Sequence, residues 1–222
     1  MMPALVRLSP PLPPVDRREV LRYAGVPAAE SADLETLCAR AEGMAAAVLR
    51  PEALYVQVPL LVDGDTVCLG DSTWHSESLA RHLSGCTQAV LMAATLGLAL
   101  DRLVQTQSVR TPSLALVLNA LGAERVEALC DCTETHIREA TGCATTRRFS
   151  PGYGDLSIDC QQDMFRMLQC EKYLSLRLTQ ARMMIPSKSV TAILGLKEDC
   201  SAPETEHRCD VCGKQDCMYR RG

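Results

Sequence analysis

The stretch ALYVQVPLLVDGDTVCLG, residues 53–70, constrains the fold more than any other part of the chain. Two apolar, β-branched runs, 55–62 and 66–69, flank the turn sequence Asp63-Gly64-Asp65. A short turn of this composition between two such runs is typical of a β-hairpin, whose strands are antiparallel. The sequence therefore predicts a sheet that contains antiparallel pairing.

Helix-like and strand-like segments are mixed along the rest of the chain, without the strict alternation of a doubly wound parallel sheet. We expect an α+β fold with a largely antiparallel sheet flanked by helices. The longest helix is expected from Pro112 to Arg138, where apolar residues recur at helical spacing. The other expected elements are an extended proline-rich arm around residues 10–14, helices at 16–25, 31–50, 77–83, 98–105 and 159–171, and strands at 87–97 and 189–196.

Composition excludes several classes of protein. The net charge of −4 and the lack of a concentrated basic face argue against a nucleic-acid-binding protein. The most apolar stretch, Ala89–Leu100, is shorter than the roughly 20 residues that a membrane span needs. The N-terminus has too short an apolar run for a signal peptide. We therefore expect a cytoplasmic protein, in which most of the twelve cysteines are reduced and buried as small apolar residues.

The segment RRFSPGYGDLSIDC, residues 147–160, has the residues of a small-molecule site. Arg148 offers a planar set of donors for a carboxylate, and Tyr153 offers a ring and a hydroxyl. Gly152 permits a backbone geometry or a close ligand approach that a side chain would block. Asp155 is placed to cap the helix that follows. On these residues alone, Pro-Gly-Tyr-Gly is also the composition of an ordinary turn.

This segment resembles the activation (reactivation) domain of cobalamin-dependent methionine synthase, because Arg148-x-x-x-Gly152-Tyr153 matches the R-x-x-x-G-Y motif of that family. The resemblance continues through MFRMLQCEKYLSLRLTQ and ARMMIPSKSVTAILGL to about residue 196. The N-terminal half resembles the free-standing form of the domain, which occurs without a fused synthase. We expect residues 1–199 to form this domain.

The resemblance implies a role in corrinoid repair. The domain would present S-adenosylmethionine to the cobalt of cob(II)alamin on a partner protein, such as a methionine synthase or related corrinoid protein that lacks its own activation domain. An electron from an unidentified donor and the methyl group would then restore methylcobalamin. Arg148 would pair with the methionyl carboxylate, Gly152 and Tyr153 would line the adenosine, and Glu124 or Glu127 would meet the amino group. The chain would act as part of a methyltransferase system in which the cofactors carry the chemistry.

Two alternatives stay open. After Tyr153 the chain reads GDLSIDCQQD where the fused family continues with a proline and cysteine segment, so a docking module without a ligand is one alternative. The other is a metal-bearing electron-transfer protein. It rests on an expected cysteine-rich tail, 200–222, whose C-x8-C-x2-C-x4-C spacing suits zinc or an iron–sulfur cluster. The four candidate ligands are Cys200, Cys209, Cys212 and Cys217.

Overall fold

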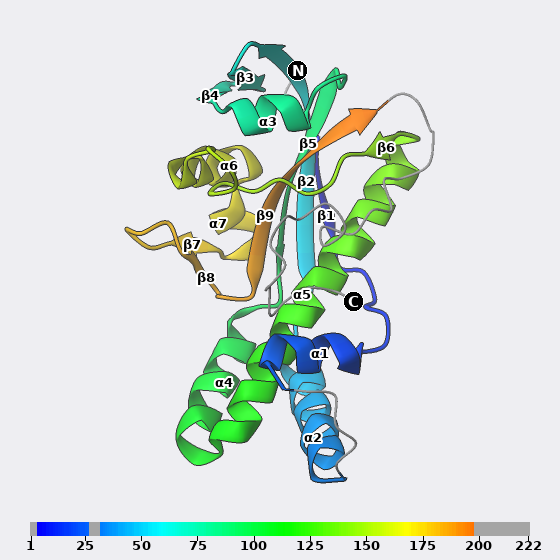
Figure 1. Ribbon diagram of the computed structural model, residues 1–222, viewed down its shortest axis with the longest axis vertical. Helices are drawn as coiled ribbons and strands as arrows, with labels where there is room; N and C mark the ends of the chain where they lie inside the picture. Colours follow the sequence, from blue (N-terminus) through cyan, green and yellow to red (C-terminus); the bar gives the residue numbers. More distant parts are fainter. Residues whose placement is uncertain (1–3, 27–31, 198–222) are drawn as a thin grey trace.

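The computed structural model describes residues 4–26 and 32–197, and these form an α+β fold around one large antiparallel sheet (Figure 1). The helices are α1 (Arg17–Ala24), α2 (Ala32–Val48), α3 (Glu77–His82), α4 (Leu98–Arg110), α5 (Pro112–Thr141), the short 3-10 helix η1 (Ile158–Cys160), α6 (Gln161–Leu168) and α7 (Cys170–Leu174). The strands are β1 (Leu5–Leu8), β2 (Glu52–Asp63), β3 (Thr66–Leu69), β4 (Ser72–His75), β5 (Gln88–Thr95), β6 (Ala144–Thr145), β7 (Arg177–Leu178), β8 (Met184–Ile185) and β9 (Ser189–Lys197).

The main sheet has the strand order β4-β3-β2-β5-β9-β6, and β1 also pairs with β2. Every pairing in it is antiparallel. The hairpin predicted at residues 63–65 joins β2 to β3, with Asp63 opposite Thr66. In the middle of the sheet Leu91 of β5 lies opposite Val56 on one side and Ile193 on the other. The predicted fold class is confirmed.

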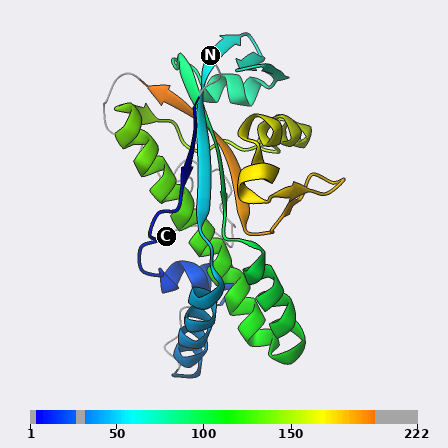
Figure 2. The ribbon, with the colours of Figure 1, turned by 180° about the vertical axis from the view of Figure 1, so that it is seen from behind.

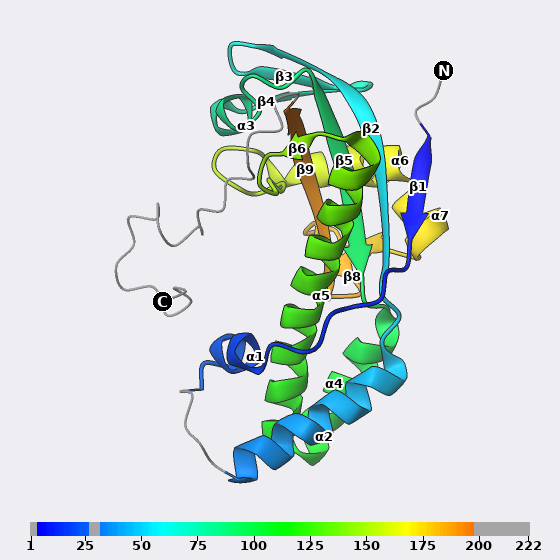
Figure 3. The ribbon, with the colours of Figure 1, turned by 90° about the vertical axis from the view of Figure 1, so that its right-hand side faces the viewer.

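Two apolar cores lie on the two faces of this sheet. Alternate residues of a strand point to opposite faces. Met92 accordingly packs with α5 residues such as Leu118 on one face, while Leu91 packs with Met164 and Phe165 of α6 on the other. Helices α1, α2, α4 and α5 contribute to the first core, and α3, α6 and α7 to the second. Figures 1 and 3 show α5 running along the sheet, and Figure 2 shows β1 on the outside of β2.

Local signals set where several helices begin and end. The Asp16 side chain accepts hydrogen bonds from the backbone N–H groups of Arg18 and Glu19, and Gly25 ends α1 in the left-handed conformation. Ser76 caps α3 by accepting a hydrogen bond from the N–H of Leu79. Helix α5 continues three residues past the predicted end at Arg138 and stops at Gly142, which is also left-handed.

Other expectations need correction. The single helix predicted over residues 159–171 is divided, because Gln169 has φ of 50° and separates α6 from α7. Strands β1, β4, β6, β7 and β8 were not predicted. Within the described ranges no helix is long and apolar enough to cross a membrane. The predicted boundary near residue 199 and the tail beyond it lie outside the described residues.

Candidate functional site

The loop that carries the R-x-x-x-G-Y motif leaves the end of the sheet and crosses toward α3. Phe149 is fixed to β9 by two backbone hydrogen bonds with Ile193, of 3.0 and 2.8 Å. The Ser150 hydroxyl donates to the carbonyl of Thr191 at 2.8 Å. These contacts with β9 fix the backbone directly after Arg148.

Arg148 is held by three carboxylates of α5. Its Nη2 lies 2.8 Å from Glu127, its Nη1 lies 2.8 Å from Asp131, and Nη1 also donates to Glu134. Positions 127, 131 and 134 fall on one face of a helix, which brings the three acids to one guanidinium. The Glu134 side chain is only 14% exposed. Burial raises the pKa of Glu134, and the nearby Arg148 partly offsets that rise. In this structure the donors predicted to bind a ligand carboxylate are bonded to the protein's own acids.

Gly152 and Tyr153 form the turn of the loop. Gly152 has φ of +89°, a conformation that favours glycine, and its N–H donates to the carbonyl of Leu156 at 2.9 Å. Tyr153 is 38% exposed, and its ring and the Phe149 ring pack in a T-shaped arrangement with 5.9 Å between centroids. The backbone N–H of Gly152 is thus bonded within the loop, while the Tyr153 ring faces solvent in part.

Asp155 caps a different helix from the one predicted. Its carboxylate accepts from the Ser76 hydroxyl at 2.5 Å and from the backbone N–H groups of Glu77 and Ser78 at 2.9 and 3.1 Å. These groups belong to the start of α3, which precedes the loop in the chain. The Ser76 hydroxyl and the two N–H groups hold the pKa of Asp155 well below its usual range. Asp155 therefore ties the motif loop to α3.

Gly154 lets the loop approach α3 closely. A Cβ added at Gly154 would lie 2.6 Å from the Ser78 hydroxyl oxygen and 2.7 Å from the Ser78 Cβ. Its φ of +56° also lies in the left-handed region. Only glycine meets both requirements at this position without displacing α3.

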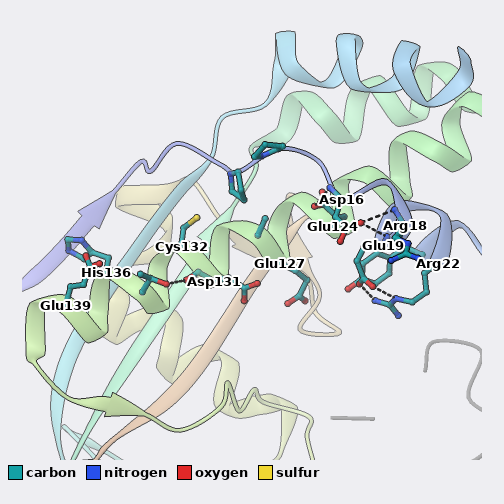
Figure 4. A pocket seen from close by; sticks show the side chains of 15 residues that line it. Asp16, Arg18, Glu19, Arg22, Glu124, Glu127, Asp131, Cys132, His136 and Glu139 are labelled. Atoms are coloured by element: carbon teal, nitrogen blue, oxygen red, sulfur yellow. Dashed lines mark hydrogen bonds and ion pairs between the residues drawn. The ribbon is translucent and has the colours of Figure 1, made fainter. Parts of the chain in front are cut away.

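A groove of about 1010 Å³ runs along α5 beneath the proline-rich arm and α1 (Figure 4). Both sequence-predicted glutamates, Glu124 and Glu127, line it. Asp131 lines it too, so the groove and the Arg148 cluster share two carboxylates. Acids outnumber bases along its wall, which makes the groove attractive to a cationic ligand. The lining is completed by Pro13, Pro14, Asp16, Arg18, Glu19, Arg22, Tyr23, Ala128, Cys132, Thr135, His136 and Glu139.

The two glutamates differ in their surroundings. Glu124 is 7% exposed and forms an ion pair with Arg125, which is 5% exposed. The Glu124 carboxylate also accepts from the Asp16 N–H at 3.1 Å, and Arg125 donates to the carbonyls of Pro13 and Pro14. Glu124 thus fixes the arm, whereas Glu127 is 41% exposed beside the groove.

Sequence reasoning missed several of these residues. Asp131 and Glu134 follow Glu127 at helical spacing, so the sequence alone could have predicted that the three carboxylates lie on one face of the helix. The contacts of Arg125 with the arm span more than 110 residues of chain, and no local pattern indicates them.

The cysteines within the described part of the chain are free thiols, and Cys38, Cys130, Cys160 and Cys170 are buried. Burial raises the pKa of Cys160 to about 11 and that of Cys170 to about 12. Within residues 4–26 and 32–197 no group of three or more His, Cys, Asp or Glu side chains is arranged so that it could hold a metal ion. The four predicted ligands of the tail, Cys200, Cys209, Cys212 and Cys217, lie outside those ranges, so their role stays a prediction.

The sheet order, the long α5 and the loop after β6 define an α+β fold that occurs among solved structures. The chain is similar to the crystal structure of the MetH reactivation domain bound to AdoHcy, with a TM-score of 0.60 and 17% sequence identity. The match covers 79% of this chain and 67% of the other. The fold is therefore that of a methionine synthase reactivation domain. No protein-family profile and no curated protein sequence matches the chain.

Proposed function

We propose that this protein binds S-adenosylmethionine along α5 and presents its methyl group to the cobalt of a corrinoid carried by a partner protein. The observation that carries the proposal is the open acidic groove beside the motif arginine, on a fold whose solved relative was crystallised with AdoHcy. S-adenosylmethionine has a sulfonium and an ammonium group. An acidic wall attracts both of these groups.

The reacting groups belong to S-adenosylmethionine and the corrinoid, and not to side chains of the protein. Cob(II)alamin accepts one electron from an external reductant and becomes cob(I)alamin. The methyl group then passes from sulfur to cobalt, the C–S bond breaking with its electron pair left on sulfur. No acid, base or nucleophile from the protein is needed, so the protein contributes by holding the methyl donor in the right position. Holding the donor in place makes the transfer effectively intramolecular once the partner is docked.

Four of the predicted ligand-binding residues have a place in this proposal. Glu127 faces the ammonium group from the wall that the groove shares with Arg148. Glu124 acts through the arm that covers the groove. Gly152 and Tyr153, within five residues of Arg148, stay predicted contacts of the adenosine. The proposed partner is, as in the sequence analysis, a corrinoid protein without its own activation domain. The electron donor is not identified.

Calorimetric titration with S-adenosylmethionine tests the binding step, alone and with a corrinoid protein present. We expect binding by the wild type and a several-fold weaker affinity for Glu127→Gln. The matched control is Glu171→Gln on α7, which removes an exposed helix carboxylate away from the groove. Absence of binding in both conditions would refute the proposal.

One observation favours a second candidate, a docking module without a ligand. Arg148 is bonded to Glu127, Asp131 and Glu134, as a purely structural arginine would be. This candidate predicts that the protein binds a corrinoid partner while S-adenosylmethionine changes neither the affinity nor the heat of that interaction. The metal-bearing electron carrier stays a prediction from Cys200, Cys209, Cys212 and Cys217 alone. Zinc, iron and sulfide analysis of the purified full chain tests it.

A further inference from the structure

Helix α3 contacts both ends of the loop that carries the R-x-x-x-G-Y motif. At the start of α3, the Asp155 carboxylate accepts the three hydrogen bonds described above. At the end of α3, the Nε2 of His82 lies 2.8 Å from the carbonyl oxygen of Arg147. Because a carbonyl oxygen only accepts, this ring nitrogen carries the proton and donates. The stretch between Arg147 and Asp155, which includes Tyr153, is therefore held at both ends by one short helix.

Three rings follow one another from α3 to the surface of the protein. The His82 and Phe149 rings are tilted by 42° to each other, with 5.1 Å between their centroids. The Phe149 ring in turn packs against Tyr153, the T-shaped pair described above. His82 and Phe149 are half-buried, whereas Tyr153 is exposed. Since the backbone of Phe149 is also bonded to Ile193 of β9, the exposed ring rests on a fixed one.

The backbone on both sides of Tyr153 is fixed as well. The N–H of Tyr153 donates to the carbonyl of Ser150 at 3.0 Å. A Cβ added at Gly154 would lie 2.6 Å from the hydroxyl oxygen of Ser78 on α3 and 3.8 Å from the Phe149 ring. The chain directly after Tyr153 thus lies against α3 and Phe149, which leaves the Tyr153 ring few orientations.

We propose that His82 is a positioning residue of the ligand site, which sets the orientation of the Tyr153 ring through Phe149 and through the carbonyl of Arg147. This inference rests on the proposed function and deepens it, because Tyr153 is a predicted contact of the adenosine. An exposed aromatic ring that is held in place suits the flat face of a purine. A ring that is already ordered also loses less conformational entropy when the ligand binds, so the affinity for the purine is higher.

The motif alone does not define this part of the site. His82 precedes Arg147 by 65 positions in the chain, and it reaches the loop only in the folded protein. Its contribution to binding is expected to depend on Tyr153, since Phe149 lies between the two rings. That dependence distinguishes a positioning residue from one that only stabilises the fold.

A double-mutant cycle of His82→Ala and Tyr153→Ala, measured by calorimetric titration with S-adenosylmethionine, tests this role. His82→Ala is expected to weaken the affinity about fivefold, the equivalent of one aromatic pair, and Tyr153→Ala at least as much. The affinity of the double variant should stay within about twofold of that of Tyr153→Ala, because His82 then has no ring to orient. The matched control is Arg81→Ala, the neighbouring residue of α3, whose side chain is 72% exposed and which should not change the affinity.

The outcomes separate the inference from the proposed function. An unchanged affinity in either single variant overturns the inference, and so does a double variant in which the two losses multiply. These results leave the proposed function intact, because the wild type binds the ligand. If the wild type does not bind S-adenosylmethionine with or without a corrinoid partner, both fail. Melting temperatures are measured first, and His82→Gln, whose amide can still donate to the Arg147 carbonyl, replaces His82→Ala in the cycle if the alanine variant does not fold.

Discussion

Replacing Glu124 by alanine tests whether this carboxylate is a structural residue. The Glu124 and Arg125 side chains are only 7% and 5% exposed, so the variant leaves a buried arginine without its counter-charge. Such a change typically costs about 3–5 kcal/mol of unfolding free energy. The Asp16 N–H also loses its acceptor. Since whole domains are stable by about 5–15 kcal/mol, the loss is a large fraction of the total.

Urea unfolding followed by circular dichroism measures this loss without any ligand. With an m-value of about 2 kcal/mol/M, a loss of about 4 kcal/mol lowers the midpoint by about 2 M. The control is Glu35→Ala, which removes a 69% exposed partner of Arg17 and should cost no more than about 1 kcal/mol. The double variant Glu124→Leu/Arg125→Leu removes both charges and should be more stable than Glu124→Ala. A loss below about 1 kcal/mol in Glu124→Ala, combined with a large loss of S-adenosylmethionine affinity, would refute the structural role.

Two further predictions concern the loop and the sheet. Asp155→Asn should lower the melting temperature at pH 7. The pKa of Asp155 is held below its ordinary value, so its contribution is complete above about pH 4 and is lost as the pH falls below that value. The difference in melting temperature between wild type and variant should therefore shrink toward pH 3, and a difference independent of pH would contradict the assignment. Gly195→Ala should destabilise the protein by about 1–3 kcal/mol in urea unfolding, because the new Cβ would lie 2.6 Å from the Cys86 sulfur and 3.0 Å from Leu83. An unchanged midpoint in Gly195→Ala would show that β9 is less tightly packed there than the structure has it.

The parts of the fold that the sequence predicted are those with strong local signals. The sequence Asp63-Gly64-Asp65 between two apolar runs is typical of a tight turn joining two strands. The apolar stripe of α5 repeats over many helical turns. Strand β1 has only four residues, and its partners in β2 lie 45 to 51 positions away. A pairing of that kind depends on tertiary contacts, which no local pattern encodes.

The candidate site was only partly predictable for a related reason. The motif identified Arg148, but its partners Glu127, Asp131 and Glu134 come from another element, and a motif says nothing of them. Asp155 shows the same limit, since the helix it caps lies nearly 80 residues earlier in the chain. The residues that carry a resemblance can be found in the sequence. The charged residues that surround them in space become known only from the folded structure.

Transfer of a labelled methyl group tests the central claim most directly. S-adenosylmethionine labelled in its methyl group is incubated with the full chain, a corrinoid protein in the cob(II)alamin state and a one-electron reductant. The proposal predicts that the label appears in the cobalamin fraction as methylcobalamin, and that the amount falls sharply when the chain is omitted. Label at the level of that control, in a sample where the chain is shown to bind both S-adenosylmethionine and the corrinoid protein, would contradict it.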